Sequence, residues 1–282
     1  MIIAETVAEL KLAINKMRAD KLKTGFIPTM GALHKGHISL LKRAMAENDR
    51  TVVSIFVNPT QFNNPDDLKK YPRTPEKDFA MLSEAGADLI FYPKEKEIYP
   101  EGRAVDTDFD FGNLEKVMEG KFRPGHFKGV AMVVSRLFEI VEPDKAYFGE
   151  KDFQQLAIIR ELVSMKKYPV EIIGCPTVRE PDGLAMSSRN QLLAPEMRMA
   201  ATKIPQALFY IRDHRQGKAL AGLKSEAVRM IEHTGQLKVE YLEIADEKTL
   251  LPIEDWNGKA QCRCLTAVMA GNIRLIDNVQ LY

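Results

Sequence analysis

Apolar runs rich in β-branched residues alternate with amphipathic stretches in the first part of this chain, and that alternation is the strongest constraint on its fold. The runs lack a polar face, which is typical of strands buried on both sides, and helical stretches separate them. This order predicts a doubly wound, Rossmann-like α/β domain whose mostly parallel sheet binds ligands at the carboxyl ends of its strands. Strands are expected at residues 24–29, 51–57, 87–92, 146–148 and 170–173, and helices at residues 37–46, 75–85, 130–141 and 153–166.

The pattern changes near residue 178. Two amphipathic helices are expected at residues 195–216 and 220–233, and strands follow at residues 238–245, 261–269 and 273–281. Helices followed by a run of strands indicate a smaller α+β domain. We therefore expect one domain over residues 1–177 and a second over residues 178–282. Residues 94–129 are expected to mix loop with short elements.

Charge and composition exclude several classes of function. Lys plus Arg number 40 against 39 Asp plus Glu, so the whole chain has no net attraction for nucleic acid or anionic membrane. No apolar run approaches the ~20 residues that a membrane span needs. Glu5 stands where a signal peptide needs positive charge. Three cysteines without a C-x-x-C pair suit a reducing compartment and predict small apolar fillers. The expected location is the cytoplasm.

The end of the first expected strand favours phosphate binding. A glycine-containing turn there leads into a helix, whose first amides and positive dipole end bind anions. His34 and His37 are three residues apart, so their rings share one helix face. The expected phosphate loop is Met30, Gly31, Ala32, Leu33, His34, Lys35, Gly36 and His37. Ordinary capping or surface histidines are one alternative. A metal site is another, although no third ligand lies nearby.

Two later segments add to this interpretation. Two hydroxyls and a guanidinium lie in a loop at Met186, Ser187, Ser188 and Arg189 and can contact phosphate oxygens. The strand-to-helix switch at Gly149, Glu150, Lys151 and Asp152 offers a cation for phosphate and a carboxylate for ribose hydroxyls. Taken singly, a serine-rich loop and a solvated helix start explain them as well. Taken together, the three segments indicate a nucleotide site.

Seven blocks in order resemble the pantothenate synthetase (pantoate–β-alanine ligase) family of the adenylate-forming nucleotidylyltransferase superfamily, and they cover nearly the whole chain. They lie at residues 28–37 (PTMGALHKGH), 56–62 (FVNPTQF), 71–74 (YPRT), 123–127 (RPGHF), 148–152 (FGEKD), 186–190 (MSSRN) and 274–278 (RLIDN). The resemblance implies ATP-dependent condensation of pantoate with β-alanine through a pantoyl adenylate, with release of AMP and pyrophosphate. It also implies a homodimer, with the strand at residues 49–57 and its neighbouring loops as a candidate contact.

The resemblance also implies roles for individual residues. His37, His34 and Lys151 would act on the transferred phosphate, and Val178 would contact adenine through its backbone. Gln61 and Gln155 would hold pantoate, with Gln61 also near β-alanine. Phosphate oxygens and water would supply most of the ligands of Mg²⁺, so no protein ligand of the metal is assigned. Because the adenylate must be kept from water, the smaller domain and its loop at residues 186–190 are expected to act as a lid.

Three other functions compete with this one. A nucleotidylyltransferase that acts on a phosphate ester would share the His-x-Gly-His turn but would not need Gln61 and Gln155. A nucleotide sensor without turnover would keep only the phosphate site. An aminoacyl-tRNA synthetase is disfavoured, because the chain is short and lacks the charge for RNA binding.

Overall fold

The computed structural model describes residues 1–63, 65–102, 109–256 and 261–281. Unit 1 comprises Met1–Phe111, Arg123–Glu150 and Gln155–Pro176, and unit 2 comprises Gly112–Phe122, Lys151–Gln154 and Thr177–Tyr282. The two short segments of unit 2 fall inside the range 1–177 that the sequence assigns to one domain. Within the described ranges, no helix is long and apolar enough to cross a membrane.

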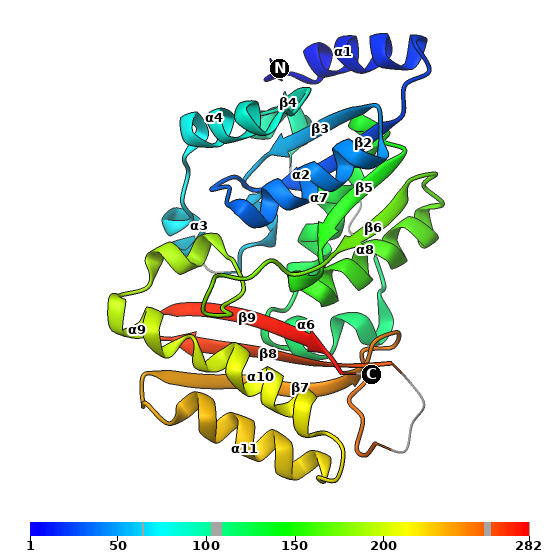
Figure 1. Ribbon diagram of the computed structural model, residues 1–282. Helices are drawn as coiled ribbons and strands as arrows, with labels where there is room; N and C mark the ends of the chain where they lie inside the picture. The colour runs from blue at the N-terminus through cyan, green and yellow to red at the C-terminus, as the bar shows by residue number, and fades with distance from the viewer. Residues whose placement is uncertain (64, 103–108, 257–260, 282) are drawn as a thin grey trace. The chain divides into compact units, whose positions relative to one another are not determined.

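Unit 1 is built on a parallel sheet of six strands in the order β1-β4-β3-β2-β5-β6 (Figure 1). The strands are β1 (Ile2–Ala4), β2 (Thr24–Thr29), β3 (Arg50–Ile55), β4 (Leu89–Phe91), β5 (Lys145–Gly149) and β6 (Glu171–Cys175). This confirms the predicted α/β class and adds the edge strand β1. From β2 the chain moves one way through β3 and β4 and the other way through β5 and β6. Such a switch point is where open α/β sheets bind ligands, at the carboxyl ends of β2 and β5.

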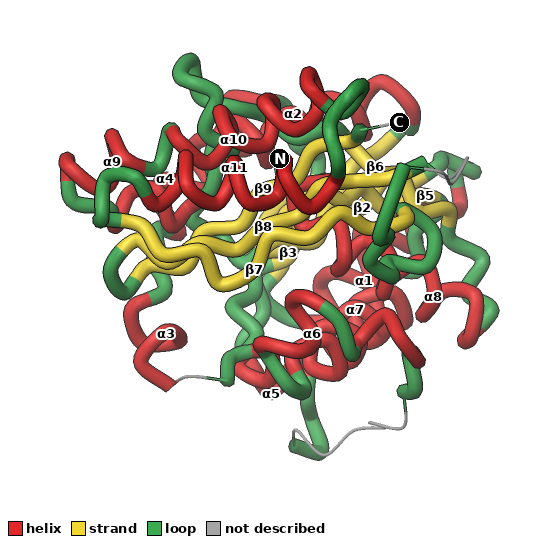
Figure 2. Tube along the Cα trace, turned by 90° about the horizontal axis from the view of Figure 1, so that it is seen from below, coloured by secondary structure: helices red, strands yellow, loops and turns green. Residues whose placement is uncertain are grey.

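Helices cover both faces of this sheet. Helices α1 (Val7–Ala19), α7 (His126–Val141) and α8 (Phe153–Lys166) lie on one face, and α2 (Lys35–Glu47) and α4 (Pro75–Ala85) lie on the other (Figure 2). The strands between them are buried on both sides, which explains why they read as continuous apolar runs. Shorter elements of unit 1 are η1 (Pro59–Gln61), α3 (Pro65–Lys70) and α5 (Glu95–Ile98). The short helix η3 (Glu150–Asp152) begins in unit 1 and continues into unit 2.

Unit 2 contains an antiparallel sheet of β7 (Leu237–Asp246), β8 (Cys262–Ala270) and β9 (Ile273–Gln280). Helices α10 (Lys203–His214) and α11 (Leu220–Glu232) pack on one face, and α6 (Met118–Phe122) lies on the other (Figures 1 and 2). The core between sheet and helices contains Leu208, Ile211, Leu223 and Ile231. The predicted smaller α+β domain is thus present. Its remaining elements are η2 (Gly112–Glu115), η4 (Ser188–Leu192) and α9 (Pro195–Ala200).

The prediction of a single helix over residues 195–216 is wrong, because two helices occupy this range. Helix α9 ends at Ala200 and α10 begins at Lys203. Pro205 has no N–H to donate to the carbonyl of Ala201, and its ring would clash with that carbonyl in a continuous helix. The N–H of Ile204 instead bonds to the Ala201 carbonyl at 3.0 Å in a tighter turn.

The three cysteines are buried and free. Burial raises the pKa of the Cys175 thiol to about 11 and also raises the pKa of Cys262 and Cys264. All three are therefore neutral thiols at pH 7, in keeping with the predicted role as apolar fillers.

Candidate active site

A buried carboxylate holds the turn that follows β2. Asp78, in the first turns of α4, is only 1% exposed. Its carboxylate accepts the N–H of Ala32 at 2.9 Å and the N–H of Leu33 at 2.8 Å. Gly31 and Ala32 both have positive φ, +78° and +49°, and glycine takes this conformation at far lower cost than alanine. The two bonds to Asp78 therefore hold Ala32 in a conformation that it does not favour.

The predicted histidine pair caps helix α2. His34 is the N-cap residue, and its Nδ1 accepts the N–H of Gly36 at 3.1 Å. The Nδ1 of His37 in turn accepts the N–H of His34 at 3.3 Å, and the ring centroids lie 4.1 Å apart. Nδ1 of both rings therefore serves the helix cap. Both the capping alternative and the phosphate-binding interpretation are compatible with this geometry.

Gln61 is held by a buried network at the end of β3. It is 7% exposed, and its Oε1 accepts from Nδ2 of Asn58 at 3.1 Å. Nδ2 of Asn58 also reaches the carbonyl of Gly129 at 3.1 Å, while the hydroxyl of Tyr99 donates to Asn58 Oδ1 at 2.9 Å. These contacts fix which end of the Gln61 amide is the acceptor. Its Nε2 points to the sulfur of Met30 at 3.1 Å, which joins it to the phosphate loop.

The remaining predicted residues divide between the two units. Gly149 ends β5, Glu150 follows, and Gln155 lies half-buried in α8, all in unit 1. Lys151 and Asp152 belong to unit 2, where Lys151 Nζ lies 3.6 Å from the Asp152 carboxylate. The carbonyl of Val178 accepts the N–H of Met186 at 2.9 Å in unit 2.

The serine-rich loop of unit 2 is ordered by its own hydrogen bonds. Ser187 caps η4, and its hydroxyl accepts the N–H of Arg189 at 3.3 Å. Ser188 is buried, and Nδ2 of Asn190 donates to the carbonyl of Ala185 at 3.0 Å. The structure thus places this loop on a short 3₁₀ helix next to the hairpin that begins at Val178.

Comparison with known proteins identifies the family. The family model for pantoate–beta-alanine ligase matches residues 2–280. The chain belongs to the pantoate–β-alanine ligase family. It is 50% identical over 284 residues to a pantothenate synthetase of Porphyromonas gingivalis and 47% identical over 281 residues to one of Bacteroides thetaiotaomicron, with 99% of both chains covered in each case.

Solved structures agree with this assignment. The crystal structure of pantothenate synthetase from Thermus thermophilus is 45% identical, covers 100% of both chains and has a TM-score of 0.93. The pantoate–β-alanine ligase of Francisella tularensis, solved with β,γ-ATP and β-alanine, is 38% identical, with 99% and 97% of the two chains covered and a TM-score of 0.83. The predicted family and fold class are therefore confirmed. The roles of single residues stay predictions.

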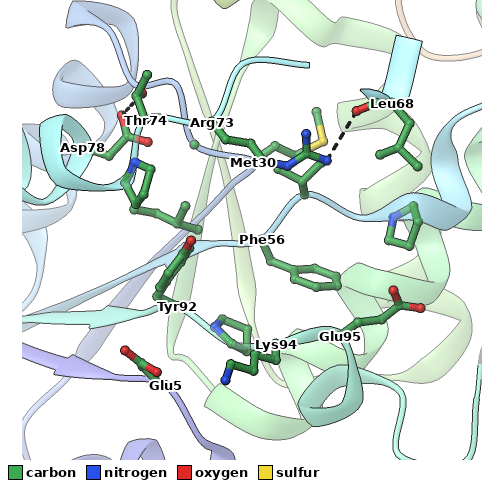
Figure 3. A pocket seen from close by; sticks show the side chains of 16 residues that line it. Glu5, Met30, Phe56, Leu68, Arg73, Thr74, Asp78, Tyr92, Lys94 and Glu95 are labelled. Atoms are coloured by element: carbon green, nitrogen blue, oxygen red, sulfur yellow. Dashed lines mark hydrogen bonds between the residues drawn. The ribbon is translucent and has the colours of Figure 1, made fainter. Parts of the chain in front are cut away.

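In this pantoate–β-alanine ligase family member, unit 1 also contains a pocket of about 450 Å³ at the carboxyl ends of β2, β3 and β4 (Figure 3). Met30 and Gly31 of the phosphate loop line this pocket, and so do Thr74 and Asp78. The hydroxyl of Thr74 donates to the Asp78 carboxylate at 3.1 Å. The other charged lining residues are of both signs: Arg73, Lys94, Glu5 and Glu95. This mixture does not select a class of ligand.

Asp78 is the main residue that the sequence analysis missed. An acidic residue in the first turns of a helix usually interacts with the helix dipole at the surface. Nothing in the local sequence connects it to a turn 46 residues earlier. Across the described residues there is no cluster of three or more His, Cys, Asp or Glu side chains suited to a metal ion.

Proposed function

We propose that this protein condenses pantoate with β-alanine in two steps that consume ATP. The carboxylate oxygen of pantoate attacks the α-phosphorus of ATP, and the bond from that phosphorus to the bridging oxygen breaks to release pyrophosphate. The amine of β-alanine then attacks the acyl carbon, loses a proton and expels AMP. Membership of the pantoate–β-alanine ligase family over residues 2–280 carries this proposal. The related Francisella tularensis enzyme, solved with β,γ-ATP and β-alanine, supports it.

The α2 amino terminus suits the first step. A carboxylate is already ionised at neutral pH, so the step needs positioning and charge stabilisation rather than a general base. The phosphate loop provides the amides and dipole of a helix start. We assign to His34 and His37 hydrogen bonds from Nε2–H to phosphate oxygens, since Nδ1 of each ring already accepts a backbone N–H. Such preorganised donors stabilise charge that develops on the phosphate.

Other assignments follow the family motifs. Lys151 would neutralise phosphate charge, and Val178, with residues 186–189, would bind adenine and phosphates. Gln61 and Gln155 would bind pantoate through their amides. Magnesium would enter as part of the MgATP substrate, with its coordination completed by phosphates and water. The described residues offer no cluster of carboxylates that would form a dedicated cage.

Two broader expectations remain proposals: a homodimer and a cytoplasmic location. The fold limits how the strand at residues 49–57 could contact a second copy of the chain. β3 is paired with β2 on one side and β4 on the other, and most of its residues are buried. It therefore has no open edge to pair with a second copy, and a contact there would have to use the neighbouring loops.

The proposed reaction is tested by isotope exchange between pyrophosphate and ATP. Exchange should require pantoate and should occur without β-alanine, because the adenylate forms first. Addition of β-alanine should then release AMP and pantothenate in equal amounts. Transfer of a nucleotide to a phosphate ester without AMP release would instead support the nucleotidylyltransferase alternative. ATP binding without any exchange would support a sensor.

Replacing Gln61 with alanine should weaken pantoate binding. The Asn58 network orients the Gln61 amide, and a lost neutral hydrogen bond costs about 0.5–1.5 kcal/mol. With two bonds lost, we expect KM for pantoate to rise on the order of 10-fold, with KM for ATP within about twofold of wild type. Asn63→Ala is the matched control, because this nearby amide donates to the carbonyl of Pro124 at the surface. Equal changes in both variants would remove Gln61 from pantoate recognition.

A further inference from the structure

The last family-like block, at residues 274–278, has no assigned role in the reaction. It forms most of β9, and its polar side chains reach three separate segments of unit 2. Arg274 binds the carboxylate of Glu119 in α6 through two bonds of 2.7 Å. Asp277 and Asn278 reach segments that contain proposed ATP ligands. Both are 3% exposed. Buried polar groups are normally hydrogen-bonded, and these three side chains make their bonds to segments that are distant in the sequence.

Asn278 holds the backbone of Lys151. Its Nδ2 donates to the Lys151 carbonyl at 2.8 Å. Its Oδ1 accepts from Nη1 of Arg263 at 2.6 Å, so the orientation of the amide is set. The guanidinium of Arg263 also lies 3.9 Å from the ring centroid of Phe153. The segment Lys151–Gln154 is therefore fastened to β8 and β9, although it lies more than a hundred residues before them.

Asp277 holds the hairpin that starts at Val178. Its carboxylate forms a bidentate pair with Arg179, with N–O distances of 2.7 and 3.0 Å. Arg179 also donates to the carbonyl of Gly183 in the turn of the hairpin at 3.0 Å and to the carbonyl of Asn278 in β9 at 3.1 Å. Burial raises the pKa of the Asp277 carboxyl, and the Arg179 charge opposes that shift. This hairpin leads directly into Met186 and the serine-rich loop.

We infer that Asn278 and Asp277 are positioning residues for the adenylation step: Asn278 places Lys151, and Asp277 places the Val178–Arg189 segment. This inference rests on the proposed function, because it gives these two segments their ligand. Lysine has a long, flexible side chain, and a fixed backbone limits the region that its ammonium can reach. Asn278 and Asp277 are adjacent residues of β9. The same strand therefore holds both Lys151 and the Val178–Arg189 segment in place.

The two residues should give different kinetic signatures. Asn278→Asp keeps an oxygen that can accept from Arg263, removes the donor to the Lys151 carbonyl and places a negative charge beside that carbonyl. It should lower kcat of pantoate-dependent exchange roughly 10- to 100-fold, because misplaced groups act mainly on the transition state. Asp277→Asn weakens the pair with Arg179 and should instead raise KM for ATP about 10-fold, with a smaller change in kcat.

A double-mutant cycle decides whether Asn278 acts through Lys151. Lys151→Ala should reduce exchange about 10²–10³-fold. In that background, Asn278→Asp should change kcat less than about twofold, since residues that act as a unit are not additive. Asn278→Ala, which also lacks the donor, repeats the cycle if the aspartate variant does not fold. A full multiplicative loss in the double variant would overturn the inference.

Thr266→Val is the matched structural control. The Thr266 hydroxyl donates to the carbonyl of Tyr241 at 2.7 Å on the same sheet, and Thr266 is 1% exposed. This variant should lower the unfolding temperature but leave kcat and KM for ATP within about twofold. Kinetic changes as large as those of Asn278→Asp would show that any damage to the sheet lowers activity, which would overturn the positioning role.

Failure of the wild-type protein to catalyse pantoate-dependent exchange would reject the proposed function itself.

Discussion

Replacing His37 with alanine is expected to slow pantoate-dependent pyrophosphate exchange about 10²–10³-fold, the usual effect of removing one preorganised electrostatic contact. The geometry suggests which atom matters. Nδ1 of His37 accepts the N–H of His34 and so serves the helix cap, and we assign Nε2 to the phosphate. The overall fold should persist, because the ring is only half-buried and the backbone N–H that it accepts lies in the same helix turn.

Two further variants separate the cap from the chemistry. Asparagine places an oxygen near the position of Nδ1 and can keep the bond to the His34 N–H, whereas glutamine places an amide nitrogen near the position of Nε2. If Nε2–H contacts phosphate, His37→Gln should retain about tenfold more exchange activity than His37→Asn. The opposite order would assign His37 to capping alone. Circular dichroism and thermal unfolding of each variant check that α2 remains intact.

Local sequence was sufficient to predict most of the fold. β2 and α4 occur at the predicted residues, because burial on both faces and a proline-led helix start both leave clear local patterns. The edge strand β1 was missed, since three residues are too few to show the alternation of apolar and polar side chains that indicates a strand. The break between α9 and α10 could have been predicted from Pro205, which follows shortly after the break.

The site was predictable only where its residues are close in sequence. The phosphate loop combines glycines, histidines and a helix start within ten residues, so it leaves a local signal. The contacts that hold the site join distant residues: Asp78 to Leu33 across 45 positions and Asn278 to Lys151 across 127. Such pairs depend on the strand order and on how the chain returns to the sheet, which no local pattern encodes. For the same reason no local pattern shows that Lys151 lies in unit 2.

The loss of Asp78 should therefore reduce both the stability of unit 1 and the activity of the protein. Asp78→Ala would leave the buried N–H groups of Ala32 and Leu33 without acceptors, each at a cost of about 1–3 kcal/mol. We expect the free energy of unfolding to fall by about 2–6 kcal/mol from these two groups together. Ala32 would also lose the bonds that hold its positive φ, so the phosphate loop should relax.

Asp88 provides the matched control for this prediction. Its carboxylate likewise accepts a backbone N–H and a hydroxyl, those of Thr51 at 2.9 and 3.0 Å, but at the amino ends of the strands. Asp88→Ala should reduce the free energy of unfolding and leave exchange kinetics within about twofold of wild type. Asp78→Ala should in addition lower kcat for exchange on the order of 10²-fold, because the phosphate loop is misplaced. Denaturant unfolding and exchange rates measured on both variants test this, and equal kinetics in the two would refute a positioning role for Asp78.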